Sequence, residues 1–287
     1  MEDALGYQGK RVVVGGAASG MGEATAAALV ELGANVIGLD IKPTQVPVKE
    51  FVEVDLRDKA SIEAGAAKIG GPVDALFCCA GLPGAPFSDV DVMKVNFVGT
   101  RHFIEQMLPH MAEGSAIAWV ASNAGLGWQQ NLENLQPLVD SQGFEAGVAW
   151  CESKLDLIGN GMSYPVSKQA INYHVAREAA TLARKGIRFN CSNPGPTATP
   201  MMPAFETNNG KGVIAAALGP IERYSTAEEQ AWPLIFLNSP RSSYVTGEAF
   251  MVDGGFFGAM QTGQIDQTKL FAALTEHMAA QAAKAAG

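Results

Sequence analysis

The sequence has few cysteines and histidines, four of each among 287 residues. It contains no Cys-x-x-Cys pair and no group of Cys and His with ligand spacing, so we predict no metal site. Cys78 and Cys79 are neighbours within an apolar run that reads as a buried strand. We therefore expect all four cysteines to be reduced, which is typical of a cytoplasmic protein.

Long apolar runs and an excess of positive charge are also missing. No run reaches the roughly 18 apolar residues of a membrane span. Residues 1–6 are acidic and lack the apolar core of a signal peptide. The net charge of -9 argues against the basic surface that a nucleic acid or an anionic membrane would need. We expect neither a nucleic acid nor a membrane as a partner.

What the chain has instead is a regular alternation of short apolar runs with helical segments. The runs that read as strands are residues 11–15, 35–39, 51–55, 75–79, 116–121, 187–192 and 249–252. The segments that read as helices are residues 23–32, 58–67, 89–111, 164–185 and 226–237. Strands that are apolar throughout and alternate with helices predict a parallel sheet covered on both faces, with ligands at the carboxyl ends of the strands.

The fold class that follows is α/β: a Rossmann-type, doubly wound parallel sheet of about seven strands. No linker rich in Pro, Gly or Ser divides the chain, so we predict a single domain over residues 1–287. Residues 123–162 read as a mostly helical insertion, and the Ala-rich residues 266–287 as a helical tail. The tail could cover the chain's own core or reach into a partner's active site.

A glycine-rich turn connects the first predicted strand to the first predicted helix. Gly16, Gly20 and Gly22 lie where the strand ends and the helix opens. Glycines allow a backbone to approach a pyrophosphate closely, and the helix N-terminus offers free N–H groups to it. This context favours a dinucleotide site, although the same glycines could serve only the packing of the turn.

Two aspartates end the next predicted strands. Asp40 ends the second strand, where a carboxylate can accept hydrogen bonds from the ribose hydroxyls and would repel a 2′-phosphate. The glycine turn contains no Arg or Lys, although Lys42 is close to Asp40. The sequence therefore predicts NAD rather than NADP as the cofactor. Asp55 ends the third strand, where its side chain could reach the adenine amino group.

Tyr164 and Lys168 lie four residues apart in a segment that reads as a helix, so they share one face. A lysine ammonium beside a phenol favours the phenolate, and we expect it to lower the pKa of the tyrosine from about 10. Such a tyrosine can take a proton from an alcohol or give one to a ketone. Taken alone, the pair could also be a surface tyrosine near a solvated lysine.

Further short motifs follow one another along the chain. They are Cys-Cys-Ala-Gly at 78–81, Lys-Val-Asn-Phe at 94–97, Val-Ala-Ser-Asn-Ala-Gly at 120–125, Asn-Pro-Gly at 193–195 with Thr199, Tyr-Val-Thr-Gly at 244–247 and Val-Asp-Gly-Gly at 252–255. Together with the glycine turn and the Tyr/Lys pair, they resemble the short-chain dehydrogenase/reductase family from Lys10 to Gly255. The chain most resembles the bacterial 3α-hydroxysteroid dehydrogenase/carbonyl reductase branch, which carries a similar insertion.

The resemblance implies four catalytic residues. Tyr164 would be the general acid/base, and Lys168 would lower its pKa and hold the nicotinamide ribose. Ser122 would bind the substrate oxygen, and Asn96 would position a water between Lys168 and bulk solvent. Asn96 could equally be a residue inside a helix that packs against its neighbours.

Because of the insertion, more than one serine has to be considered as the catalytic serine. Ser122 and Tyr164 are 42 residues apart (164 − 122), far more than the family usually has between them. Ser153 and Ser163 are nearer to the tyrosine, but neither ends a predicted strand. Since Ser122 does, it remains the predicted catalytic serine.

The resemblance also implies a set of cofactor contacts. The residues implied are Gly16, Ser19, Gly20, Met21, Gly22, Asp40, Asp55, Leu56, Ala80, Gly81, Tyr164, Lys168, Pro194, Gly195, Thr197 and Thr199. The chain departs from the family pattern at Gly15, where threonine is usual, and at Cys78 and Cys79, where two asparagines are usual. We expect these changes to tune cofactor affinity without abolishing binding.

These features predict an oxidoreductase that transfers a hydride between NAD(H) and a secondary alcohol or ketone. Residues 200–205 are apolar and rich in methionine, which suits an irregular apolar ligand, so we expect a bulky substrate such as a hydroxysteroid. Alternatives are a terpenoid or aryl-alcohol dehydrogenase, other chemistry with the same cofactor, or a protein that senses NAD without turnover. Insertion residues that could line the pocket, or equally pack as a core, are Leu126, Trp128, Leu132, Leu135 and Trp150.

The family resemblance further implies a homo-oligomer, either a dimer or a tetramer. The insertion precedes the tyrosine helix, a surface that the family often uses for assembly. Its acidic residues, set against Lys154, are Glu133, Asp140, Glu145, Glu152 and Asp156. We expect the insertion to alter the usual tetramer and to leave a dimer through the last predicted helix and strand.

Overall fold

The computed structural model describes residues 3–265, 268, 272, 275 and 276, so the predicted tail at 266–287 lies almost entirely outside the described residues. Seven strands form one parallel sheet in the order β3-β2-β1-β4-β5-β6-β7. The strands are β1 (Arg11–Gly15), β2 (Asn35–Asp40), β3 (Glu50–Glu53), β4 (Val73–Cys78), β5 (Met111–Val120), β6 (Arg188–Pro194) and β7 (Ala249–Val252). The predicted fold class is confirmed.

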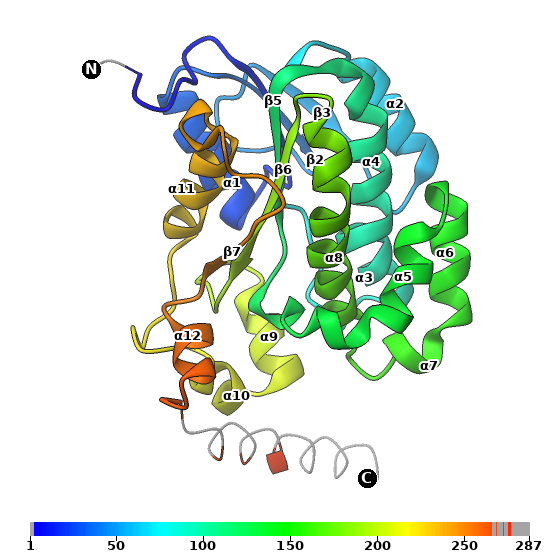
Figure 1. Ribbon diagram of the computed structural model, residues 1–287, viewed down its shortest axis with the longest axis vertical. Coiled ribbons are helices and arrows are strands. Elements are labelled where there is room, and N and C mark those ends of the chain that lie inside the picture. Colours follow the sequence, from blue (N-terminus) through cyan, green and yellow to red (C-terminus); the bar gives the residue numbers. More distant parts are fainter. Residues whose placement is uncertain (1–2, 266–267, 269–271, 273–274, 277–287) are drawn as a thin grey trace.

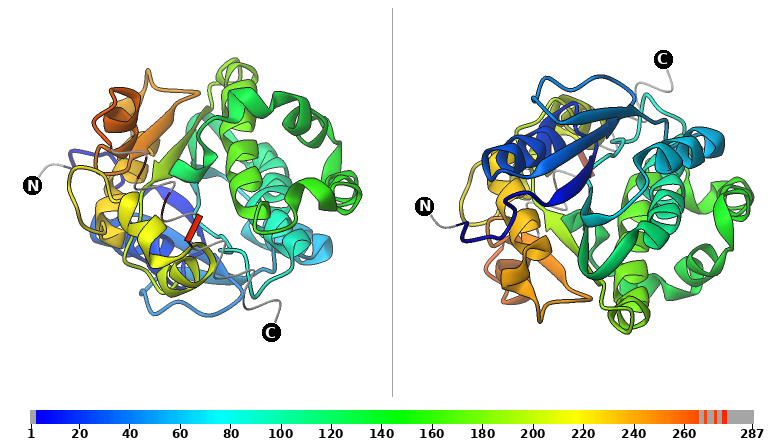
Figure 2. Two further views of the ribbon diagram at one scale, coloured as in Figure 1. Left: turned by 90° about the horizontal axis from the view of Figure 1, so that it is seen from below. Right: turned by 90° about the horizontal axis from the view of Figure 1, so that it is seen from above.

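Helices cover both faces of this sheet (Figures 1 and 2). Those on one face are α1 (Gly20–Glu31) and α11 (Ala227–Asn238); those on the other are α2 (Lys59–Ile69), α4 (Gly99–Met107) and α8 (Ser163–Ala183). Successive residues of β1 serve opposite layers, because side chains alternate along a strand. Val12 and Val14 pack in the α1/α11 core, whereas Val13 packs in the core beneath the other three helices.

The single helix predicted over 89–111 is wrong in detail. The segment contains α3 (Asp89–Met93), a π-helix η1 (Lys94–Val98), α4 and a 3-10 turn η2 (Leu108–His110). β5 then begins at Met111, five residues earlier than predicted, because Met111 pairs with Val73 of β4. Pairing with β4 therefore extends β5 beyond the apolar run from which the strand was predicted.

The insertion lies outside α4 and α8 (Figure 1). Its elements are η3 (Asn123–Gly125), η4 (Trp128–Asn131), α5 (Leu132–Asp140), α6 (Gly143–Ser153) and α7 (Leu155–Ile158). Leu135 and Trp150 are buried in the core, and Trp128 stacks on Tyr173 of α8 with 5.6 Å between ring centroids. Leu135 and Trp150 thus follow the core-packing alternative, whereas Leu132 is 37% exposed.

Three short helices lie at the end of the sheet where the strands terminate: α9 (Met202–Asn209), α10 (Lys211–Ala216) and α12 (Phe256–Gln261) (Figure 1). None of the helices in the described part of the chain is long and apolar enough to cross a membrane.

Candidate active site

A cavity of about 960 Å³ lies along the carboxyl ends of the strands, from the glycine turn and the end of β2 to α9 and α10. This is the edge at which a doubly wound sheet binds ligands. The predicted catalytic and cofactor-binding residues all line this cavity except Gly22 and Asn96. Gly22 and Asn96 do not line the cavity but contact residues that do, as described below.

The glycine turn forms a cradle that a larger side chain would fill. Gly16 has a φ of 79°, and a Cβ there would lie 2.6 Å from the backbone nitrogen of Ala80. A Cβ on Gly22 would lie 2.1 Å from the carbonyl oxygen of Gly16. Glycine is therefore required at both positions. The turn brings its backbone and the start of α1 to the cavity, an arrangement that fits a pyrophosphate.

Asp40 presents its carboxylate at the edge of the cavity next to the glycine turn. Its Oδ2 accepts a hydrogen bond from the backbone nitrogen of Ala18 at 3.1 Å. Its Oδ1 accepts from Ile41 at 2.7 Å and from Lys42 at 3.3 Å. The backbone thus fixes a negative group where the resemblance places the adenosine ribose.

Asp55 also lines the cavity, but its carboxylate is already paired. The Arg57 guanidinium donates to both carboxylate oxygens, with Nη2 2.7 Å from Oδ2 and Nε 3.0 Å from Oδ1. These hydrogen bonds lower the pKa of Asp55. Arg57 is itself a cavity residue that the sequence did not single out, since nothing in its local pattern distinguishes it from a solvated arginine.

Asn96 lies fully buried in the middle of the π-helix η1. Its Oδ1 accepts from the backbone nitrogen of Leu82 at 2.7 Å, and its Nδ2 donates to the Leu82 carbonyl at 3.1 Å. The same Nδ2 donates to Ser167 Oγ at 3.1 Å. Asn96 therefore ties the loop after β4 to α8, a more specific arrangement than ordinary packing inside a helix, and π-bulges of this kind often mark functional sites.

Ser122 and Tyr164 meet across the cavity despite the insertion between them. Ser122 follows β5 and caps η3, where its Oγ accepts from the Ala124 nitrogen at 3.1 Å. A side-chain hydrogen bond from Ser122 to Tyr164 favours the phenolate. The Tyr164 ring also contacts Phe205 of α9 edge to face, with 4.9 Å between centroids.

Lys168 lies one turn beyond Tyr164 on α8, as predicted, but the expected effect on the phenol is wrong. Burial raises the pKa of Tyr164 to about 12, and the Ser122 hydrogen bond only partly offsets this. Burial also lowers the pKa of Lys168 to about 8. The Lys168 Nζ lies 5.4 Å from the tyrosine ring centroid and donates to the Val120 carbonyl at 3.0 Å. Desolvation of both groups therefore outweighs their attraction.

The loop after β6 closes the cavity opposite the glycine turn. A Cβ on Gly195 would lie 2.9 Å from the Asp253 Cα, so this loop packs directly on the segment after β7. Thr197 is held by hydrogen bonds of 2.9 Å to the Gly195 carbonyl and to Ser225 Oγ. The Thr199 side chain would lie 3.3 Å from a Cβ on Gly20, so the two loops face one another closely.

Beyond the catalytic side chains the cavity opens into an apolar lobe. Its walls include Met201, Phe205, Val213, Ile214 and Ala217 from the α9–α10 segment. Asn208 of α9 donates to the Ala85 carbonyl at 3.0 Å, which joins this segment to the loop after β4. The sequence indicated the methionine-rich start of this wall but not α10. The insertion contributes Asn123, Ala124, Asn160 and Gly161 to the lining.

Two family models match the chain. The model described as "short chain dehydrogenase" matches residues 10–133, and the one described as "Enoyl-(Acyl carrier protein) reductase" matches residues 147–257. The chain is 31% identical to the coniferyl-alcohol dehydrogenase of a Pseudomonas species over 86% of its own length and 96% of that protein. The chain belongs to the short-chain dehydrogenase/reductase family.

Other relatives of the chain in this family are dehydrogenases of alcohols. The chain is 30% identical to the 3-alpha-hydroxysteroid dehydrogenase/carbonyl reductase of Comamonas testosteroni, over 88% of its length and 98% of that protein. The crystal structure of a Pseudomonas 3-alpha-hydroxysteroid dehydrogenase complexed with NADH matches with a TM-score of 0.76 and 26% identity. That match covers 88% of this chain and 99% of that one. The predicted resemblance is confirmed.

Proposed function

We propose that the protein is an NAD-dependent dehydrogenase of secondary alcohols that acts on a bulky apolar substrate such as a hydroxysteroid. One observation carries this proposal. Ser122, Tyr164 and Lys168 meet in a cavity that extends on one side to the glycine turn and Asp40. On its other side the same cavity extends to the apolar walls of α9 and α10.

The side chains of the site divide the work between proton transfer and positioning. A nicotinamide cofactor bound at the glycine turn would supply the hydride chemistry. Because burial keeps the phenol of Tyr164 protonated, it is suited to give its proton to the ketone oxygen in reduction; in oxidation it would take the hydroxyl proton of the alcohol only from its phenolate form. Ser122 Oγ, hydrogen-bonded to Tyr164, orients the substrate oxygen. Lys168 would hold the nicotinamide ribose, and Asn96, which holds the loop at Leu82, would position a water beside Lys168.

The preference for NAD rests on Asp40. Its carboxylate, fixed by three backbone N–H groups, would accept the ribose hydroxyls and repel a 2′-phosphate. Structural neighbours include proteins with either cofactor: NADH in the Pseudomonas 3-alpha-hydroxysteroid dehydrogenase, and NADP in a Beutenbergia cavernae protein described as a "putative NAD(P) dependent gluconate 5-dehydrogenase". Membership of the family therefore does not distinguish NAD from NADP, and the preference for NAD is argued from Asp40.

The apolar lobe supports a bulky uncharged substrate, because burial of apolar surface is the main driving force available there. The hydroxysteroid assignment draws on the Comamonas and Pseudomonas relatives. An aryl alcohol is the second candidate. It is supported by the similarity to a coniferyl-alcohol dehydrogenase and by Phe205, whose ring stands against Tyr164 and could pack on an aromatic substrate.

The test is a screen for formation of reduced cofactor with hydroxysteroids, terpenoid alcohols and aryl alcohols, each supplied with NAD and with NADP. We expect turnover with NAD and a hydroxysteroid. Tyr164→Phe should bind NAD normally and lose about 100-fold or more in turnover, the scale of general acid–base catalysis. Small polar alcohols that outrun every bulky one, a preference for NADP, or near-normal turnover of the variant would each contradict part of the proposal.

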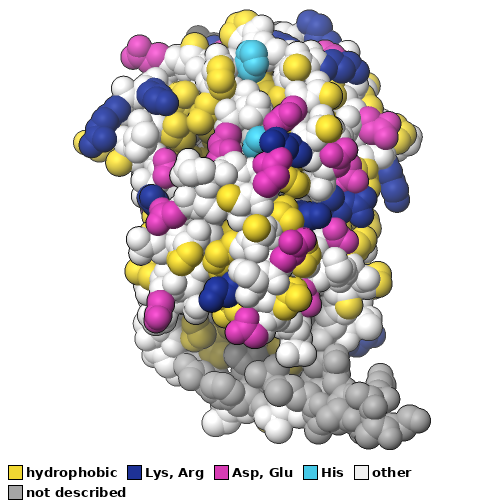
Figure 3. All heavy atoms as spheres, turned by 90° about the vertical axis from the view of Figure 1, so that its right-hand side faces the viewer, with side chains coloured by type: hydrophobic (Ala, Val, Ile, Leu, Met, Phe, Trp, Pro, Cys, Tyr) yellow, Lys and Arg dark blue, Asp and Glu magenta, His cyan; other side chains and the backbone are white. Residues whose placement is uncertain are grey.

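We also propose that the protein is a cytoplasmic homodimer. Its four cysteines are free, which suits a reducing compartment. Trp232 and Phe236 of α11 and Phe250 of the edge strand β7 are exposed by 46%, 41% and 40%. Large exposed apolar side chains close to an unpaired strand edge favour association. By contrast, the face that carries α6 shows scattered charged side chains (Figure 3).

A further inference from the structure

We propose that Asn172 is a positioning residue that fixes Ser122 against the helix carrying Tyr164 and Lys168. This inference rests on the proposed dehydrogenase function and adds a residue to its machinery. Asn172 lies on α8, four residues after Lys168 and eight after Tyr164, so all three share one helix face. It is 2% exposed and is not among the residues that line the cavity.

The side-chain amide of Asn172 joins three elements. Its Nδ2 donates to the Gly125 carbonyl of η3 at 3.0 Å and to Asn193 Oδ1 of β6 at 3.1 Å. Its Oδ1 accepts a hydrogen bond from the Cys191 thiol of β6 at 3.2 Å. Both amide hydrogens and the oxygen are thus engaged, which fixes the orientation of the amide.

Asn193 passes this position on to Ser122. The Oδ1 that accepts from Asn172 also accepts from the backbone nitrogen of Ser122 at 3.3 Å. Ser122 is therefore held through its own backbone, and the turn that follows it is held at Gly125. On the other side, Lys168 Nζ binds the Val120 carbonyl two residues before Ser122. The end of β5 is clamped to α8 before and after the serine.

Close packing makes this clamp rigid. A Cβ on Gly125 would lie 2.7 Å from Asn172 Nδ2 and 2.7 Å from the Lys168 carbonyl oxygen. Gly125 therefore packs directly on α8 and leaves no room for a side chain of its own. A group that orients a reacting oxygen must be held to within a fraction of an ångström, and a misplacement of about 1 Å can cost roughly 100-fold in rate.

The alternative is that Asn172 only stabilises the core. The variant Asn172→Leu removes both donors while keeping similar volume, and Asn172→Ser is a smaller change in case the first does not fold. The matched control is Cys191→Ala. It removes the thiol that donates to Asn172 Oδ1 and leaves the hydrogen bonds from Asn172 Nδ2 to Gly125 and Asn193 in place. Each variant is also made in a Ser122→Ala background.

If Asn172 positions Ser122, Asn172→Leu lowers kcat by about 10- to 100-fold while the dissociation constant of NAD stays within about threefold. In the Ser122→Ala background the same change lowers kcat by less than about threefold, because its target is gone. Cys191→Ala stays close to wild type. An equal loss of kcat in both backgrounds, or no loss in either, overturns the inference.

A readout without turnover separates this inference from the proposed function. Hydrogen exchange of the peptide that contains Ser122 to Gly125 should become faster in Asn172→Leu or Asn172→Ser and stay unchanged in Cys191→Ala. Unchanged exchange in the Asn172 variants overturns the inference even if no alcohol is oxidised. Faster exchange in a protein that oxidises none of the alcohols supports the clamp and contradicts only the proposed function.

Discussion

At the scale of single residues, burial sets the chemistry of the site. Tyr164 and Lys168 form the pair that the sequence indicated, yet each is shifted toward its neutral form because both are removed from water. The ammonium is stabilised mainly by one carbonyl, that of Val120.

This arrangement predicts a pH-dependent stability. Lys168 loses its proton near pH 8 in the folded protein and near 10.5 in the unfolded chain. Between these values the unfolded chain binds more protons, so the lysine's contribution to stability rises with pH. Below pH 8 both states are charged, and the cost of the buried ammonium, of the order of 3 kcal/mol, is present in full.

Lys168→Met removes this dependence. Relative to the variant, the wild type should gain melting temperature as the pH rises from about 8 to about 10.5. Thermal unfolding of both proteins across this range measures the difference. A difference that stays constant with pH would show that Lys168 does not titrate as its burial implies.

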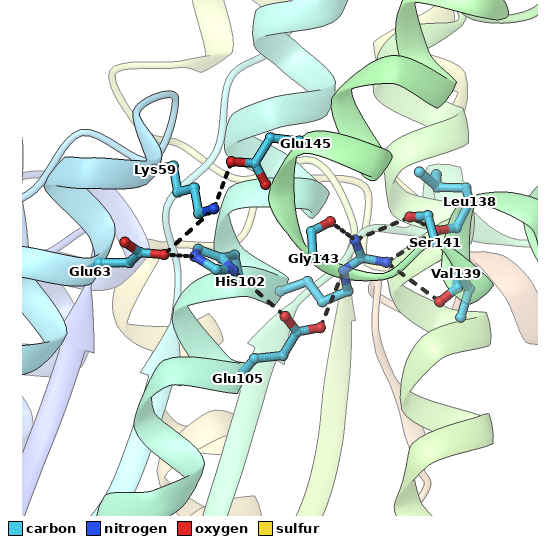
Figure 4. Close-up of polar contacts among 10 residues, drawn as sticks. Lys59, Glu63, His102, Glu105, Leu138, Val139, Ser141, Gly143 and Glu145 are labelled. Carbon is cyan, nitrogen blue, oxygen red and sulfur yellow. Dashed lines mark hydrogen bonds and ion pairs between the residues drawn. The ribbon is translucent and has the colours of Figure 1, made fainter.

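At the scale of secondary-structure elements, one buried arginine anchors the insertion. Arg101 of α4 is 1% exposed. Its guanidinium donates to the Leu138 carbonyl at 3.0 Å, to Ser141 Oγ at 3.2 Å and to the Gly143 carbonyl at 3.0 Å (Figure 4). Leu138 and Ser141 lie at the C-terminal end of α5, where the helix dipole favours a cation, and Gly143 is the first residue of α6.

We predict that Arg101→Met destabilises the protein by roughly 2–4 kcal/mol, because it removes several buried hydrogen bonds whose donor is charged. The loss should appear first as proteolytic cleavage within α5 or α6. The matched control is Arg177→Met, which breaks the exposed ion pair between α8 and Asp140 of the same insertion and should cost less than about 1 kcal/mol. If denaturant titrations showed equal losses of unfolding free energy in the two variants, Arg101 would not anchor the insertion.

At the scale of the whole molecule, the insertion and the far edge of the sheet differ as surfaces for assembly. The insertion covers α4 and α8, and Lys59 of α2 pairs with Glu145 of α6 at 2.6 Å on that side (Figure 4). The sheet ends at the edge strand β7. The exposed apolar residues of α11 lie near this edge, on the face of the sheet that α4 and α8 do not cover. Burial of those residues against a second copy would remove them from water.

We predict that Trp232→Glu converts the dimer into a monomer, because it places a charge within the apolar contact. The matched control is Leu155→Glu, which changes another exposed apolar residue, this one on α7 of the insertion. It should leave the dimer intact. Sedimentation analysis of the two variants measures the mass; a monomeric wild type, or a dimer that survives Trp232→Glu, would contradict this interface.

The sequence by itself determined the order of the elements and indicated most of the residues that the fold gathers around one cavity. Apolar runs predicted the strands. A glycine turn and two aspartates predicted the edge of the sheet at which a cofactor would bind. Both kinds of signal are local in the sequence and recur at known spacings. The tertiary structure decided what depends on distant partners. Asn96 meets Leu82, Asn172 meets Asn193 and Gly125, and Met111 joins Val73.

The same reason explains the ionisation of Tyr164. A spacing of four residues shows that a lysine is near, but the water removed around both groups depends on the loops and helices packed over them, including α9. Desolvation is a property of the assembled fold. The sequence therefore indicated which residue we propose as the acid/base, and only the three-dimensional packing set its proton affinity.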